Sequence, residues 1–71
     1  MAKTVFKDEG DAPRGGYVIW EYEDGHPVYQ YTGYYRGGNE MILYPHHAIV
    51  KGTKRDKRTL PVRDLVRAAK R

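Results

Sequence analysis

The sequence has neither cysteine nor serine among its 71 residues. Without cysteine, no disulfide framework and no zinc–thiolate site can stabilise so short a chain. Without serine and cysteine, the commonest side-chain nucleophiles are missing, and the chain also has no glycine-rich phosphate loop or metalloprotease motif. We therefore expect a protein that is not an enzyme and that uses no cofactor.

Histidine is scarce, and its spacing does not suit a metal site. The three histidines are His26, next to a predicted turn, and the adjacent His46 and His47. Neighbouring residues of an extended chain point to opposite sides, so His46 and His47 are not expected to bind one ion together. We expect no bound metal.

The sequence also lacks a long apolar run. No run approaches the roughly 20 residues that cross a bilayer, and the first ten residues, MAKTVFKDEG, do not contain the apolar core of a signal peptide. These features lead us to expect a soluble cytoplasmic protein that makes no membrane contact.

Acidic residues become rare toward the end of the chain. Residues 1–50 carry four Lys or Arg and seven Asp or Glu, a net charge of −3, whereas residues 51–71 carry nine and two, a net charge of +7. Such asymmetry is typical of proteins that bind a polyanion, usually nucleic acid, although a solubilising tail has the same composition.

Residues 1–16 offer little to bury. They end in DEGDAPRGG, a cluster of charged residues, glycine and proline that is typical of irregular chain. We expect a flexible N-terminal arm over residues 1–16, with at most one short strand at residues 4–7, followed by a single domain over residues 17–71.

From residue 17 the pattern becomes that of a β-hairpin. YVIWEYE is rich in aromatic and β-branched residues, and Asp24 and Gly25 follow it as the strongest short-range hairpin signal. A regular register around that turn sorts the side chains by strand alternation, and the face rich in rings is the predicted core face. That face contains Val18, Trp20, Tyr22, Pro27, Tyr29 and Tyr31.

Two further elements complete the expected fold. A turn centred on Gly37 and Gly38 leads to a third strand, EMILYP, which adds Ile42 and Tyr44 to the core face, and a short fourth strand is expected at residues 48–51. In TLPVRDLVRAAKR, the apolar residues recur with the spacing of one helical stripe. The predicted fold class is therefore α+β, a small antiparallel meander of three to four strands packed against one C-terminal amphipathic helix.

The basic segment KGTKRDKRTLPVRD is the strongest functional signal. Clusters of Lys and Arg hold phosphate backbones, and exposed aromatic rings beside them stack on bases. We expect a small non-enzymatic nucleic-acid-binding protein, for DNA or RNA, that uses this basic loop and the helix for phosphate contacts. The candidate residues are Lys54, Arg55, Lys57, Arg58, Arg63, Arg67, Arg36 and Tyr34.

A protein-binding module is the alternative. If the helix covers only one face of the sheet, an aromatic and apolar second face stays exposed, and such patches mark interfaces. The protein would then be a regulator or inhibitor, or a homodimer, and the basic patch would serve either function. The residues of this face are Tyr17, Ile19, Tyr34, Met41 and Leu43.

Overall fold

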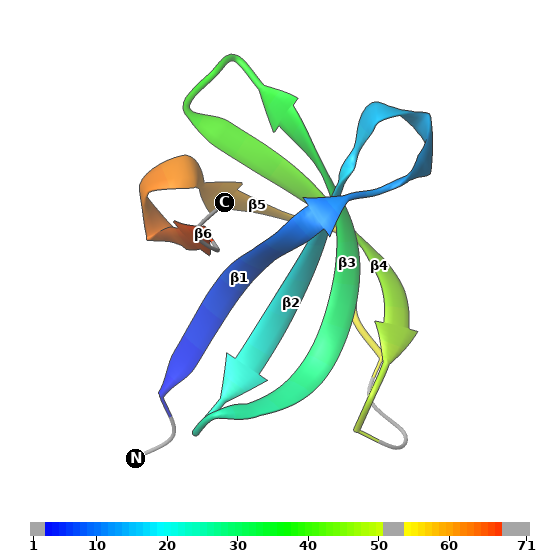
Figure 1. Ribbon diagram of the computed structural model, residues 1–71, viewed down its shortest axis with the longest axis vertical. Coiled ribbons are helices and arrows are strands. Elements are labelled where there is room, and N and C mark those ends of the chain that lie inside the picture. Colours follow the sequence, from blue (N-terminus) through cyan, green and yellow to red (C-terminus); the bar gives the residue numbers. More distant parts are fainter. Residues whose placement is uncertain (1–2, 51–53, 68–71) are drawn as a thin grey trace.

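The computed structural model describes residues 3–50 and 54–67, and these residues form an all-β domain. Its strands are β1 (Thr4–Asp11), β2 (Tyr17–Glu23), β3 (His26–Arg36), β4 (Glu40–Ala48), β5 (Arg58–Pro61) and β6 (Leu65–Arg67), and its short 3-10 turns are η1 (Pro13–Gly15) and η2 (Val62–Asp64). The strands make one six-stranded sheet in the order β5-β4-β3-β2-β1-β6, which curls into a half-barrel (Figure 1). Neighbouring strands are antiparallel except β1 and β6, which are parallel.

The predicted α+β fold is wrong, because residues 58–67 form β5, η2 and β6 in place of a C-terminal helix. Residues 68–71, the end of the expected helix, lie outside the described residues. Leu60 and Leu65 are buried, whereas Val66 is 50% exposed. The helical spacing of apolar residues is overridden by pairing with the two sheet edges, where only Leu60 and Leu65 point inward. Within residues 3–50 and 54–67, no helix has the length and apolarity to cross a membrane.

The connection between β5 and β6 requires the sheet to curl. Six strands spaced about 4.8 Å apart would separate the two edges of a flat sheet by roughly 24 Å. β5 ends at Pro61 and β6 begins at Leu65, and four Cα steps span about 14 Å at most. The two edge strands must therefore approach each other, and the half-barrel encloses the core between them.

The β2–β3 hairpin has the predicted turn but not the predicted register. Asp24 and Gly25 both have positive φ, 50° and 80°, as the turn requires, and Tyr22 pairs with Pro27 as expected. A bulge then shifts the register by one residue, so that Glu21 pairs with Tyr29. Beyond the bulge, each β3 side chain therefore shares its face with the alternate set of β2 side chains, not with the set that a regular register would place beside it.

The core consequently contains a different face of β2. Tyr29 and Tyr31 are buried, which confirms that part of the prediction, but Ile19 joins them instead of Trp20, which is only half-buried. The second turn has a similar effect on β4. It contains three residues, 37–39, where two were predicted, so the register shifts by one residue and Ile42 and Tyr44 lie on the outer face of the sheet. The core residues are Phe6, Ile19, Tyr29, Tyr31, Met41, Leu43, Leu60 and Leu65.

Part of the segment that the sequence predicts as an arm belongs to the sheet. β1 covers residues 4–11 and lies between β2 and β6. Phe6 enters the core, and the buried carboxylate of Asp8 accepts a hydrogen bond from the Gly10 N–H at 3.0 Å, where the strand has a bulge. The breakers around residues 12–16 therefore form a loop between β1 and β2.

Gly33 lies where a side chain would collide with the core. A Cβ on Gly33 would lie 2.6 Å from Met41 Sδ and 3.0 Å from Ile19 Cγ1, and both neighbours are fully buried. We expect Gly33→Ala to lower the free energy of unfolding by about 1–3 kcal/mol, because overpacking displaces core side chains. Urea denaturation followed by Trp20 fluorescence measures this loss. The loss should shrink in a Met41→Ala background, and an equal loss in both backgrounds would contradict the collision.

Candidate nucleic-acid interface

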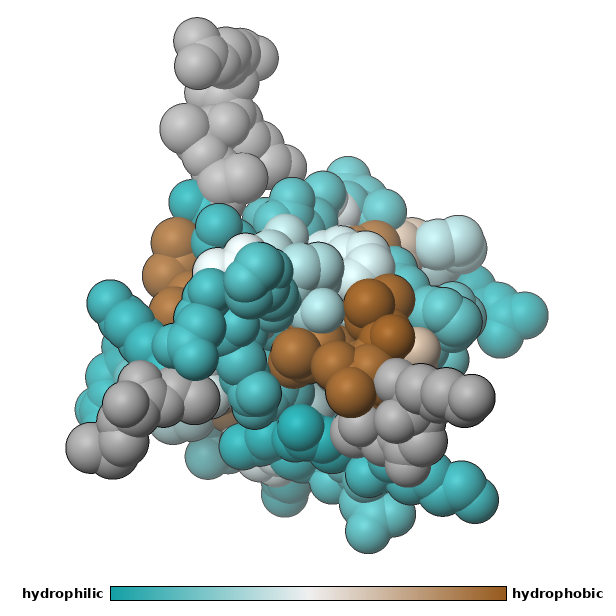
Figure 2. Space-filling model, turned by 90° about the horizontal axis from the view of Figure 1, so that it is seen from below, coloured by the Kyte–Doolittle hydropathy of each residue, from teal (hydrophilic) through white to brown (hydrophobic). Residues whose placement is uncertain are grey.

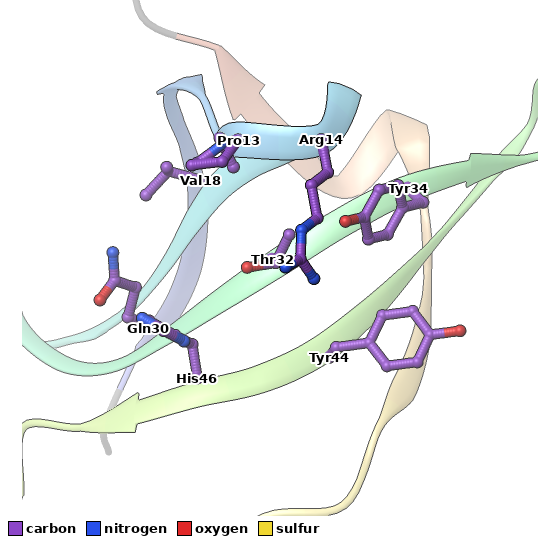
Figure 3. A pocket seen from close by; sticks show the side chains of 9 residues that line it. Pro13, Arg14, Val18, Gln30, Thr32, Tyr34, Tyr44 and His46 are labelled. Atoms are coloured by element: carbon purple, nitrogen blue, oxygen red, sulfur yellow. The ribbon is translucent and has the colours of Figure 1, made fainter.

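An open groove runs across the outer face of β2, β3 and β4. Its floor consists of side chains that strand alternation turns away from the core, and its wall is the loop between β1 and β2 (Figure 3). The lining residues are Ala12, Pro13, Arg14, Val18, Gln30, Thr32, Tyr34, Tyr44 and His46. The groove therefore presents aromatic, cationic and hydrogen-bonding groups together.

Two tyrosines from adjacent strands form the aromatic part of the groove. The ring centroids of Tyr34 and Tyr44 lie 5.9 Å apart with an interplanar angle of 74°, an edge-on contact. The Gly16 backbone packs so close to Tyr34 that a Cβ there would lie 3.0 Å from the ring. The loop thus supports Tyr34, while Tyr44 is 42% exposed and available to a partner.

Cationic groups lie beside both tyrosines. Arg14 reaches from the loop toward the sheet and points between Thr32 and Tyr34 (Figure 3). Lys57 places its Nζ 5.9 Å from the centre of the Tyr44 ring. Rings and cations in this arrangement can hold a planar group and an anionic group of the same ligand.

The sequence-predicted basic residues do not form one patch. Lys57 reaches the groove, but Arg58 packs its guanidinium over Phe6 at 5.1 Å, and Arg67 packs over Tyr35 at 5.6 Å. Arg63 lies 4.0 Å from Asp64, and both side chains are exposed. Lys54 and Arg36 are exposed.

Arg55 belongs to a buried network on the inner side of the sheet. Its Nη1 lies 3.4 Å from Glu21 Oε1, and its guanidinium lies 5.7 Å from the centre of the Tyr29 ring. Glu21 is 2% exposed and accepts a hydrogen bond of 2.6 Å from the Tyr31 hydroxyl. Burial, and then the bond to Glu21, raise the pKa of Tyr31 to about 12. Arg55 therefore compensates a buried carboxylate, and its charge is not free for phosphate.

The mouth of the half-barrel beside this network carries both signs of charge. Glu21, Glu23 and Asp64 line it together with Arg55 and Arg58. A polyanion would meet the carboxylates of Glu23 and Asp64 there, while Arg55 is already occupied by the buried Glu21, so this mouth suits nucleic acid less well than the outer groove. In the described part of the chain, no group of three or more potential ligands is arranged to hold a metal ion.

The face proposed for a protein partner is largely the core. Ile19, Met41 and Leu43 are fully buried, and Tyr17 is half-buried against Tyr35, with ring centroids 5.2 Å apart. Of that set, only Tyr34 lies on the outer face, in the groove. The folded protein cannot offer the predicted apolar face as an interface.

A small apolar cluster occupies the end of the molecule where β2 and β4 terminate, amid a mostly hydrophilic surface (Figures 1 and 2). Ile49 and Val50, which directly follow β4, are 43% and 45% exposed. Their N–H groups both donate to the Val28 carbonyl oxygen, at 3.2 and 3.4 Å. Two exposed aliphatic residues are normal for a small protein and do not define an interface.

Arg14 and Tyr44 were missed by sequence reasoning. Arg14 belongs to the segment PRGG, whose composition is typical of irregular chain. Its position at the sheet can be predicted only if the preceding residues are recognised as a strand, which makes PRGG part of the loop between two strands. Tyr44 falls on the core face if the second turn has two residues, whereas residues 37–39 make the turn. Asn39, a residue typical of turns, was the signal for the longer turn.

Compared with protein-family models, with curated proteins and with solved structures, the chain shows no significant similarity to any of them. Its function therefore has to be inferred from its own residues.

Proposed function

We propose that the protein binds nucleic acid without catalysing a reaction, and that the outer groove with its adjoining basic residues is the contact surface. The observation that carries this proposal is the tyrosine pair of the outer groove, half-buried Tyr34 and exposed Tyr44, with a cation beside each ring, Arg14 near Tyr34 and Lys57 over Tyr44. Aromatic rings next to Lys and Arg match the two chemical parts of a nucleotide, its base and its phosphate.

The charge of the chain supports the same proposal. The formal net charge is +4, and the segment that precedes β5 carries the exposed residues Lys54 and Lys57, of which Lys57 reaches the groove at Tyr44. Phosphate contacts supply most of the affinity in non-specific nucleic-acid binding, because each one releases condensed counterions. Exposed lysines on this segment would act in this way and would require no particular nucleotide sequence.

Binding is expected to weaken steeply with salt, and the two exposed lysines of the segment before β5 should set part of the slope. In Lys54→Gln with Lys57→Gln, the slope of log affinity against log salt should become shallower by about 1.8 for a duplex, or about 1.4 for a single strand, because two phosphate contacts are lost. Fluorescence anisotropy with labelled DNA and RNA across a salt series measures this slope.

A matched variant separates local contacts from net charge. Arg63→Gln with Arg67→Gln removes the same charge from η2 and β6, away from the groove residues, and should change the slope less. Equal effects of the two double variants would contradict the groove as the contact surface. If no labelled nucleic acid binds even at low salt, the proposed function is wrong.

A further inference from the structure

The shape of the groove limits which form of nucleic acid can reach its rings. Both tyrosines line the groove, and the loop that carries Pro13 and Arg14 forms its wall on the side of Tyr34, so the rings lie in a hollow and not on a protruding surface (Figure 3). In a duplex, bases are stacked on each other and present only their edges, so a paired base cannot lay its face on a recessed ring. An unpaired base can be turned out of its strand and enter.

The two tyrosines leave ring surface available for stacking. A parallel stack would cover one face of each ring. In the edge-on contact, at an interplanar angle of 74°, the edge of one ring meets the face of the other, so only one of the two rings has a face covered. The exposure of Tyr44, 42%, agrees with this geometry. A base stacked on Tyr44 would also lie near Lys57, whose Nζ is 5.9 Å from the ring centre.

Arg14 is held over the groove by a constrained loop. Its φ is 69°, a left-handed conformation that is uncommon for residues other than glycine, and Gly15 follows with a φ of 79°. A hydrogen bond of 2.9 Å from Ala12 N–H to the Gly16 carbonyl oxygen closes the loop. Such local strain is often found at functional sites, and here it projects a guanidinium onto the outer face of the sheet.

The charge of Arg14 is not compensated within the described ranges, residues 3–50 and 54–67, where no carboxylate lies within ion-pair distance of it. The same holds for Lys57 among these residues. Two uncompensated cations therefore flank an open aromatic recess. A phosphodiester on either side of a stacked base would neutralise them.

From these observations, and resting on the proposed function, we propose that the groove is a site for single-stranded nucleic acid. An unpaired base stacks on Tyr44, and Arg14 and Lys57 bind the flanking phosphates. The recess reads the aromatic face that all bases share, so DNA and RNA single strands are both ligands.

The test compares three labelled probes of about 12 nucleotides, a dT strand, the matching rU strand and the dA·dT duplex, by fluorescence anisotropy at one salt concentration. We expect the single strands to bind at least about tenfold more tightly than the duplex. Tyr44→Ala should weaken single-strand binding by about 5- to 150-fold, the usual effect of removing one stacking ring. Tyr44→Phe, which keeps the ring, should restore most of the affinity, and the duplex should respond weakly to both.

Tyr22→Ala is the matched control. Tyr22 lies outside the groove on the same face of β2 as Val18 and has its own cation, with Lys7 Nζ 4.7 Å from its ring centre. Its removal should leave single-strand affinity within about twofold, with circular dichroism verifying that each variant is folded. Arg14→Ala should weaken single-strand binding, and Arg14→Lys should recover part of it.

The outcomes separate this inference from the proposed function. Equal affinity for duplex and single strand, with Tyr44→Ala neutral, would overturn the single-strand site and leave general nucleic-acid binding intact. Equal losses from Tyr22→Ala and Tyr44→Ala would overturn the assignment to this groove. Absence of binding to all three probes would overturn both proposals.

Discussion

Raising the pH from 10 through 12 is expected to remove up to about 2.7 kcal/mol from the free energy of unfolding through Tyr31 alone. The pKa of this tyrosine is raised from 10.0 to about 12, first because the side chain is fully buried and second because it donates a hydrogen bond to Glu21. Between these two pH values, the unfolded chain loses the proton while the folded protein keeps it. The folded state then binds more protons, so stability is intact below pH 10 and falls as the pH rises.

Tyr31→Phe isolates the contribution of this hydroxyl. The variant should be less stable at neutral pH by about 1–3 kcal/mol, because Glu21 loses a donor inside the core. It should also lose less stability than the wild type between pH 10 and pH 12, because the titrating group is gone. Tyr44→Phe, a change at an exposed tyrosine, should alter the stability at neutral pH by no more than about 0.5 kcal/mol. Urea denaturation at stepped pH tests this, and parallel wild-type and Tyr31→Phe profiles would contradict the assignment.

Local chemistry predicts the β2–β3 turn but not the core that follows it. Asp24 and Gly25 have the positive φ values that their sequence suggests, yet the bulge before Tyr29 reverses the faces. The sequence pattern favours a regular register, because that register keeps the charged side chain of Glu21 out of the core. The fold instead buries Glu21 because Tyr31 and Arg55 satisfy it, and the partnership with Arg55 depends on tertiary structure that local patterns do not reveal.

The end of the chain shows the opposite problem, a strong local pattern that tertiary structure overrides. Residues 59–71 have helical spacing, but two free sheet edges each take a short strand from residues 58–67. The edges can be recognised only when β1 and the curl of the sheet are known. The same holds for the groove. Strand alternation predicted Tyr34 and the cluster of basic residues predicted Lys57, whereas Arg14 and Tyr44 required the β1–β2 loop and the three-residue turn.

Leu60→Ala and Leu65→Ala are each expected to lower the free energy of unfolding by about 2–5 kcal/mol, the usual cost of truncating a core leucine. Leu60 and Leu65 are 5% and 8% exposed, and they fill the core from β5 and β6, opposite Met41 and Phe6. Leu65→Met, which nearly conserves volume, should cost less than about 1.5 kcal/mol and keeps the test usable if an alanine variant does not fold. Urea denaturation followed by Trp20 fluorescence gives all three values.

Val66→Ala is the decisive comparison, because Val66 is the next residue along β6 and is 50% exposed. A strand turns consecutive side chains to opposite faces, so this truncation should cost no more than about 0.5 kcal/mol. On an amphipathic helix, the two residues would share one apolar stripe and their truncations would have similar costs. Comparable losses of stability from Leu65→Ala and Val66→Ala would therefore contradict the assignment of β6 as a strand. A several-fold larger loss from Leu65→Ala would support it, and with it a half-barrel in which one segment of the chain supplies the strand at each edge of the sheet.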